Sequence, residues 1–418
     1  MAIRIAIINT VACNGGDAAI LAAIADQLRG TFPRAVLTAY DSQPDAAARY
    51  HGWIRFDAGA YHAARGSGAW PRRIRWLAGA ALRGAGRRRA AALIVHRDDV
   101  RRLSRMARSR IVISTGGTYL VETYALKPRF FEFLSVRLLG RPLVLYTQTL
   151  GPFRTALNRW GMRRVLLWSR RVFVRDAASR RIALGLGADA ALTFVVPDVV
   201  FGAAPQGGPD RLRTASIGTR PRIAVSVREL KPFAPHSPAA RGEYETAMAA
   251  LVSHLVRARG ARVEFLSTCQ GIAEYRYDDS IVAERIVIRL PADVRAAVGI
   301  IGGHHPAREL MSRFAGYDAV IATRMHAAIM ALAAGTPVLP VPYERKIDEL
   351  FRELEAPFDI VQATGARGEA LIASWQEFER SLPLWRETLA ARVAAMRDAA
   401  RSPAGEIARM LRTVSAGV

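Results

Sequence analysis

Short apolar runs alternate with longer amphipathic segments along the whole chain. The runs IRIAIIN and PLVLYT are almost continuously apolar, which is typical of parallel strands that helices cover on both faces. In the first half this pattern predicts strands at Ile3–Asn9, Ala35–Tyr40, Arg110–Ser114, Pro142–Gln148, Val172–Arg175 and Leu192–Val196. It predicts helices at Asp17–Arg29, Arg87–Ala107, Arg129–Leu139, Thr155–Ser169 and Ala177–Leu184.

A second series of the same kind begins after residues 203–221, a stretch rich in Gly, Pro, Ser and Thr that is the best candidate for a linker. The second series predicts strands at Arg222–Val227, Arg262–Leu266, Ile286–Leu290, Ala319–Thr323 and Pro337–Val341. Its predicted helices are Tyr244–Arg259, Pro306–Ala315, Met325–Ala334 and a tail from about Glu369.

Two such halves predict the α/β fold class, with two Rossmann-like domains that face a cleft. We place the N-terminal domain at residues 1–205 and the C-terminal domain at residues 219–385. Residues 386–418 then form a C-terminal helical tail.

Turns rich in Gly, Asn, Thr and Gln follow three of the predicted strands in the first half. Open α/β sheets bind ligands at the carboxyl ends of their strands, so we expect these turns to line the cleft. Asp17 stands where the N-cap of the first helix is expected. One interpretation is that it merely caps the helix, and the other is that its carboxylate faces the cleft. The other cleft-lining candidates are Asn14, Gly15, Gly16, Gly116, Gly117, Thr118 and Gln148.

A carboxylate inside an apolar run predicts a buried ion pair. Asp198 lies in VVPDVVF, and a buried carboxylate needs a partner, for which Arg175 is the candidate. Asp176 and Ser179 are predicted to cap the helix that follows Arg175.

Cations follow two predicted strands in the second half. Arg228 and Lys231 follow one buried strand, and Arg324 follows another, with His326 in the first turn of an apolar helix. An arginine and a helix N-terminus together form an anion site. A histidine beside a bound anion can relay protons, although a histidine in an Ala-rich helix is otherwise a core residue.

Composition narrows the class of protein. The 418 residues are 51% hydrophobic and 23% charged, so long disorder is not expected. Two cysteines, Cys13 and Cys269, exclude a disulfide scaffold and a structural zinc site, and we expect no metal.

The start of the chain lacks the pattern of a signal peptide. The uncharged run Met325–Tyr343 contains three prolines, so it is not a spanning helix, and we expect a cytoplasmic protein.

The formal net charge of +24 favours anionic partners. Residues 70–110 contain 13 Arg against two Asp. These residues are either a solvated basic helix face or a surface for anionic lipid on the inner face of the cytoplasmic membrane. A nucleic-acid partner is not expected, because no recognised binding fold or aromatic stacking module is visible. The apolar side chains among the arginines are Trp70, Ile74, Leu77, Leu103 and Met106.

The motifs together resemble the polysaccharide pyruvyl transferase family over about residues 5–355. They are NGGDAAIL, TGGTYL, YTQTLGPF, FVRDAASRRIALGLG and TRMHAAIMALAAGTPVLPVPYERK. The resemblance implies a fold like that of the B-type glycosyltransferases, with an acceptor side in the N-terminal domain and a donor side in the C-terminal domain. It implies transfer of pyruvate from phosphoenolpyruvate to two hydroxyls of a sugar, which forms a ketal and releases phosphate.

The resemblance also assigns site residues. Arg324 and His326 match the family's R-x-H motif at the donor site, and Arg228 is the match for a further donor-binding arginine. The chemistry agrees, since a donor with a carboxylate and a phosphate needs several cations, to which Lys346 can add. His326 then supplies the acid and Asp17 the base, with no cofactor besides phosphoenolpyruvate as co-substrate.

The acceptor is expected to be a sugar, an oligosaccharide or a lipid-linked saccharide. One alternative is a glycosyltransferase of the same fold that uses a nucleotide-sugar donor. Another alternative, from a different class, is a basic protein that only binds membrane surfaces.

Overall fold

The computed structural model describes residues 3–64, 68–205, 207–230 and 238–416. The chain falls into two compact units. Unit 1 comprises residues 1–13, 20–199 and 399–418, and unit 2 comprises residues 14–19 and 200–398. The domain limits at residues 205, 219 and 385 stay predictions.

Unit 1 is built on a parallel sheet with the strand order β3-β2-β1-β4-β6-β7-β8, in which β5 also pairs with β6. The strands are β1 (Arg4–Thr10), β2 (Val36–Asp41), β3 (Arg55–Ala58), β4 (Ile111–Ser114), β5 (Gly117–Leu120), β6 (Leu143–Leu150), β7 (Ser169–Val174) and β8 (Thr193–Val195). The helices are α1 (Gly15–Thr31), α2 (Pro44–Tyr50), α3 (Ala69–Gly84), α4 (Arg88–Ile94), α5 (Arg97–Ala107), α6 (Lys127–Leu138), α7 (Ala156–Trp168) and α8 (Ala177–Gly185), with 3₁₀ turns at Ala190–Leu192 and Val199–Ala203.

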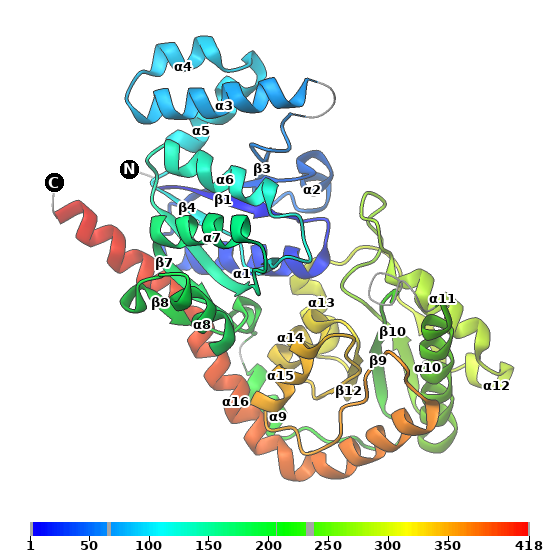
Figure 1. The fold of residues 1–418 in the computed structure, drawn as a ribbon. Coiled ribbons are helices and arrows are strands. Elements are labelled where there is room, and N and C mark those ends of the chain that lie inside the picture. Colours follow the sequence, from blue (N-terminus) through cyan, green and yellow to red (C-terminus); the bar gives the residue numbers. More distant parts are fainter. Residues whose placement is uncertain (1–2, 65–67, 206, 231–237, 417–418) are drawn as a thin grey trace. The chain divides into compact units, whose positions relative to one another are not determined.

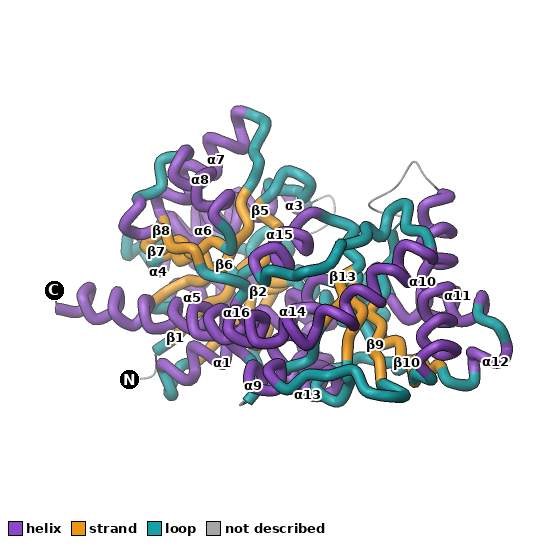
Figure 2. Tube along the Cα trace, turned by 90° about the horizontal axis from the view of Figure 1, so that it is seen from below, coloured by secondary structure: helices purple, strands orange, loops and turns teal. Residues whose placement is uncertain are grey.

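Helices flank the strands of this sheet (Figures 1 and 2). On one face, alternate strand residues such as Ile8 and Leu145 share a core with Phe133 of α6. On the other face, the hydroxyl of the buried Tyr146 donates to Gln27 of α1 at 2.7 Å. Burial on both faces explains why these strands are almost continuously apolar.

Unit 2 has a second parallel sheet, with the order β11-β10-β9-β12-β13. Its strands are β9 (Arg222–Ser226), β10 (Arg262–Phe265), β11 (Val298–Ile300), β12 (Ala319–Ala322) and β13 (Val338–Pro340). Its helices are α9 (Gly208–Arg213), α10 (Pro238–Arg259), α11 (Asp279–Arg289), α12 (Ala292–Arg295), α13 (Ala307–Phe314), α14 (Met325–Ala334) and α15 (Arg345–Glu353). The last helix, α16 (Gly368–Ala416), has residues in both units.

Both sheets have the doubly wound strand order, in which the direction of the strand order reverses beside the first strand. That switch point lies between β1 and β4 in unit 1 and between β9 and β12 in unit 2. Ligands of such sheets bind outside the carboxyl ends of the strands at the switch point. The residues that follow these four strands are therefore the candidates for ligand contacts.

Most of the predicted elements are confirmed, with ends shifted by a few residues, and so are two predicted contacts. Arg175 Nη2 lies 2.6 Å from Asp198 Oδ2, and both side chains are buried. Asp176 caps α8, because its carboxylate accepts from Ser179 N at 2.6 Å.

Several predictions were wrong. The predicted strand Ile286–Leu290 lies at the end of helix α11 and beyond, where Ile286 continues the buried helix face of Val282 and Ala283. The predicted helix Arg87–Ala107 is broken after Ile94, where the chain turns so that Val95 can pack in the core. The candidate linker contains helix α9, which packs against α14.

Glu132 of α6 is a carboxyl group buried in the core of unit 1. Its Oε1 accepts from Tyr61 N at 2.9 Å, and its Oε2 has no partner among the described residues. Burial raises the pKa of Glu132 from 4.5 to about 7. Between these two pH values the folded protein holds a proton that the unfolded chain releases, so stability falls as pH rises through this window.

We predict that Glu132→Gln removes this pH dependence, because glutamine cannot ionise and keeps the acceptor for Tyr61 N. Its melting temperature relative to the parent should rise between about pH 5 and about pH 8, as measured by thermal unfolding across that range. Asp45→Asn, at an exposed carboxylate of the same unit, should show a constant difference. A constant difference for Glu132→Gln as well would refute the prediction.

Candidate active site

Two arginines stand at the switch point of the sheet in unit 2. Arg228 follows β9 by two residues, and Arg324 follows β12 by two residues and precedes helix α14. Since β9 and β12 are paired neighbours in parallel register, both arginines leave the sheet at its carboxyl edge. They lie close enough for the charge of Arg324 to act on Arg228.

Arg324 is buried and held by Asp279, the first residue of α11. Its Nε and Nη2 donate to the two carboxylate oxygens of Asp279 at 2.8 and 2.6 Å. Burial alone would lower the pKa of Arg324, but the charge and hydrogen bonds of Asp279 outweigh it and raise the pKa. Arg324 is therefore a permanent cation with a fixed orientation, and these two bonds do not involve its Nη1.

Arg228 is the more weakly neutralised of the two. Its guanidinium lies over the ring of Tyr343, 4.1 Å from the centroid, and its Nη1 donates to the Tyr343 hydroxyl. Burial and the charge of Arg324 lower the pKa of Arg228 from 12.5 to about 10. At neutral pH Arg228 stays charged although its burial and the neighbouring Arg324 disfavour the charge. A bound anion would therefore stabilise the charged form.

His326 lies in the first turn of α14, half-buried, against the start of helix α1. A Cβ on Gly16 would come within 2.3 Å of His326 Nδ1, so only a glycine lets the backbone approach this ring. The close approach joins the two sequence motifs NGGD and RMH within unit 2.

Asn14, and not Asp17, caps helix α1. Asn14 Oδ1 accepts from the backbone N–H groups of Gly16 and Asp17 at 3.0 and 3.3 Å, and its Nδ2 donates to Tyr275 at 2.6 Å. The predicted capping role of Asp17 is wrong, because the helix begins two residues earlier at Gly15. Asp17 is then a half-buried carboxylate in the first turn, beside the glycine that His326 contacts.

Gly15 makes an even closer contact than Gly16. A Cβ there would lie 1.6 Å from the carbonyl oxygen of Thr268, so no side chain fits. These two glycines therefore serve the packing of α1 onto the loop after β10 and onto His326.

Two lysines were the other predicted cations near this site. Lys346, in the first turn of α15, has its Nζ 3.9 Å from Glu344 Oε2. The charge of Glu344 also acts on Arg228. Lys231 lies outside the described residues.

The remaining cleft-lining candidates belong to unit 1. Gln148 is buried, and its amide donates to the Tyr119 hydroxyl at 2.6 Å. Gly116 and Gly117 run from β4 into β5, and Thr118 is half-buried. Their role in lining a cleft stays a prediction.

Sequence reasoning missed Asp279, Tyr343 and Tyr275. Asp279 stands 45 residues from Arg324 in the sequence, and nothing local indicates that the two meet. The available signal was the pair Asp278–Asp279 before an apolar run, which is typical of a helix start. The wrong strand at Ile286–Leu290 concealed it.

The site holds two neighbouring guanidiniums in a desolvated place. Arg324 is paired with Asp279, and a histidine at a helix N-terminus stands two residues from Arg324. Such an arrangement can bind a small anion with more than one acidic group and supply a proton to it. Among the described residues, no group of three or more His, Cys, Asp or Glu is placed to hold a metal ion.

Solved structures with the same fold cover nearly the whole chain. The UDP-GlcNAc 2-epimerase of Neisseria meningitidis, solved with UDP-GlcNAc, matches at 11% identity and a TM-score of 0.57, over 98% of this chain and all of that one. HepE of Anabaena, solved with UDP-glucose, matches at 13% identity and 0.52, over 99% and 100%. Sucrose-phosphate synthase of Thermosynechococcus elongatus matches at 12% identity and 0.53, over the same shares. The predicted fold, like that of the B-type glycosyltransferases, is confirmed.

Sequence relatives point to one family. The amylovoran biosynthesis protein AmsJ of Erwinia amylovora is 28% identical over 254 residues, which are 59% of this chain. The match spans about 60% of the length of that relative. The model of the family "Polysaccharide pyruvyl transferase" matches residues 14–345, which include Asn14, Arg228, Arg324 and His326. This chain therefore belongs to the polysaccharide pyruvyl transferase family.

Proposed function

We propose that the protein transfers pyruvate from phosphoenolpyruvate onto two hydroxyls of a sugar in a polysaccharide or its precursor, forming a ketal and releasing phosphate. The observation that carries the proposal is the pair of neighbouring, desolvated guanidiniums of Arg228 and Arg324 at the carboxyl edge of the sheet, of which Arg324 is held by Asp279. Membership of the family and the similarity to a protein of amylovoran biosynthesis support the reaction class.

The negative charges of phosphoenolpyruvate complement the positive charges of these two arginines. Phosphoenolpyruvate has a carboxylate and a phosphate, and a guanidinium binds either group through paired N–H donors. Arg324 is already oriented by Asp279, so it loses little freedom on binding. Arg228 regains a counter-charge, with Lys346 nearby as a further cation.

The reaction also needs an acid and a base. His326 delivers a proton to the methylene carbon of the donor, which makes the neighbouring carbon electrophilic. Asp17 takes the proton of the first sugar hydroxyl as that hydroxyl attacks. The second hydroxyl then displaces phosphate, and its proton leaves on the phosphate. The proton of the first hydroxyl replaces the proton that His326 gave to carbon, so the reaction is balanced.

The proposal predicts that phosphoenolpyruvate, and not a UDP-sugar, raises the melting temperature. It also predicts phosphate release that requires a saccharide acceptor, tested with free, nucleotide-bound and lipid-linked sugars. Stabilisation by UDP-glucose alone, with no phosphate release on any acceptor, would favour a nucleotide-sugar glycosyltransferase and contradict the proposal.

Arg228 gives the clearest test of the donor site. Arg324→Ala would leave Asp279 buried without its partner and so endanger folding, whereas Arg228→Gln removes a charge that burial and Arg324 already disfavour. We expect Arg228→Gln to keep its melting temperature and to bind phosphoenolpyruvate roughly 10- to 150-fold more weakly, as measured by calorimetry.

The matched control is Arg222→Gln, an exposed arginine at the amino end of the same strand. It should bind phosphoenolpyruvate as the parent does. If Arg228→Gln also binds like the parent, Arg228 does not contact the donor.

His326→Gln tests the acid. Glutamine keeps a hydrogen-bond donor but cannot deliver a proton, so we expect near-normal donor affinity and a turnover reduced by about 10²–10⁴-fold. His254→Gln on α10 is the control for loss of a half-buried histidine. A lower melting temperature with unchanged turnover would instead make His326 a packing residue.

A further inference from the structure

Helices α3, α4 and α5 form an outer layer of unit 1 beyond α6 (Figure 1). Their inner faces are firmly packed. Trp76 is buried and donates to Ser135 of α6 at 3.1 Å, and Leu103 and Met106 lie in the core. Leu103 and Met106, which the sequence places among the arginines, are therefore core residues and are not available to a membrane surface.

The arginines that face inward are neutralised by two carboxylates. Arg72 donates to both oxygens of Asp99 at 2.5 and 2.8 Å. Arg102 pairs with Asp99 and Asp57, and Arg105 pairs with Asp57. The acidic groups Asp57 and Asp99 are thus occupied within unit 1.

Five outward arginines lack such compensation among the described residues. Arg75, Arg101 and the consecutive residues 87–89 are exposed. Within the described ranges, no carboxylate lies within ion-pair distance of any of them. Burial together with the charges of Arg88 and Arg108 lowers the pKa of Arg83 at the α3–α4 corner, as expected where positive charges crowd.

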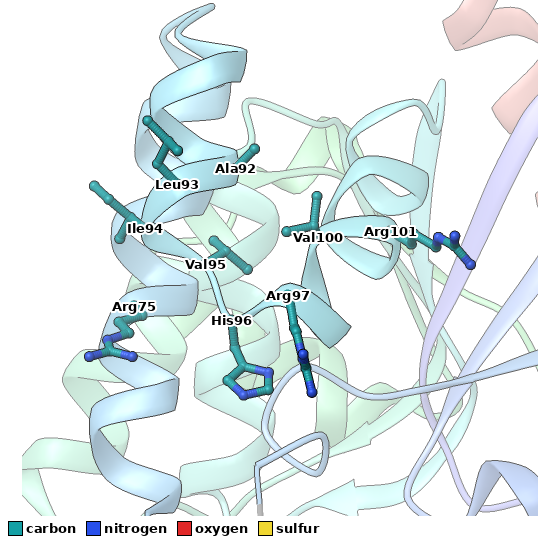
Figure 3. Close-up of a pocket in the computed structure, with 9 residues that line it drawn as sticks. All are labelled: Arg75, Ala92, Leu93, Ile94, Val95, His96, Arg97, Val100 and Arg101. Atoms are coloured by element: carbon teal, nitrogen blue, oxygen red, sulfur yellow. The ribbon is translucent and has the colours of Figure 1, made fainter.

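Large apolar side chains stand among these arginines. Leu93 is 87% exposed and Ile94 is 40% exposed at the end of α4, and Trp70 and Ile74, one turn apart on α3, are 65% and 52% exposed. Leu93 and Ile94 line an open pocket of about 900 Å³ together with Arg75, Arg97 and Arg101 (Figure 3). Cations and apolar groups therefore lie together at this pocket, and Trp70 and Ile74 lie on the same helix as Arg75.

We propose that this basic helical surface, made of Trp70, Ile74, Arg75, residues 87–89, Leu93, Ile94 and Arg101, binds an anionic phospholipid bilayer. Its charge complements lipid phosphates, which guanidiniums bind through paired donors. The apolar side chains then enter the boundary between headgroups and acyl chains.

Leu93 and Ile94 favour a bilayer over a nucleic acid. Nucleic acids are bound by cations and by aromatic rings that stack on bases, and two exposed aliphatic side chains gain little there. A bilayer both neutralises the arginines and removes the aliphatic surface from water. This inference concerns binding alone and does not depend on the proposed donor chemistry.

Flotation of the protein with lipid vesicles tests the proposal. We expect it to float with vesicles containing phosphatidylglycerol but not with vesicles of phosphatidylcholine alone. Binding should fade between about 0.1 M and about 1 M salt, as the screening length falls from roughly 10 to roughly 3 Å.

Two sets of variants separate charge from apolar insertion. Replacing Arg87, Arg88 and Arg89 by glutamine should weaken partitioning about fivefold per arginine. Leu93→Ser with Ile94→Ser should also weaken it while leaving the remaining binding sensitive to salt. All these side chains are exposed, so the melting temperature should be unchanged.

The matched control is Leu157→Ser with Trp160→Ser on α7, where the two side chains are 67% and 59% exposed. This variant should bind vesicles as the parent does. The proposal is overturned by equal binding to neutral vesicles, by no binding to either, or by loss of binding only in the α7 variant. Binding to a single-stranded oligonucleotide with no effect of the Leu93 and Ile94 changes on vesicle binding would also overturn it.

Discussion

The buried ion pair between Arg324 and Asp279 holds together the carboxyl edge of the sheet in unit 2. Asp279 accepts two hydrogen bonds from Arg324 and a third from the hydroxyl of Ser267 at 2.8 Å. Ser267 in turn exchanges a 2.8 Å hydrogen bond with Ser226 of β9. One carboxylate thereby connects residues that end or follow β9, β10 and β12. Removing one partner of such a pair costs about 3–5 kcal/mol, so the positions of Arg228 and His326 depend on it.

The guanidinium of Arg228 stands close to this ion pair and is not part of it. The ion pair satisfies Arg324 and leaves Arg228 near a second guanidinium, where the ring and hydroxyl of Tyr343 and the charges of Asp279 and Glu344 offset its charge in part. In unit 1 the inward arginines of α3 and α5 are instead matched by carboxylates. The contrast matters because arginine is abundant everywhere in this chain and its presence alone means little. A guanidinium is informative where burial and a like charge oppose it, since an anionic ligand relieves both.

The alternation of apolar runs was sufficient to predict the fold class and most strands, because strands buried on both faces have a local signature. Local chemistry also predicted the cap at Asp176, and the apolar surroundings of Asp198 predicted its pairing with Arg175. Non-local pairing was not predictable in the same way. Asp279 meets Arg324 because β10, β9 and β12 lie side by side in one sheet although they are far apart in the sequence. A short run such as residues 286–290 fits a strand and a helix face equally well.

The glycines of NGGD illustrate why a motif can be recognised before its role is understood. A glycine-rich turn before a helix is typical of an anion site, yet the N–H groups of Gly16 and Asp17 are taken by Asn14. Gly15 and Gly16 are instead required by what lies against them, the carbonyl of Thr268 and the ring of His326. The sequence shows only that these two positions are glycine. The structure shows which neighbouring atoms leave no room for a side chain there. For Gly16 the neighbour is the candidate acid itself, so these two glycines act on the site through packing.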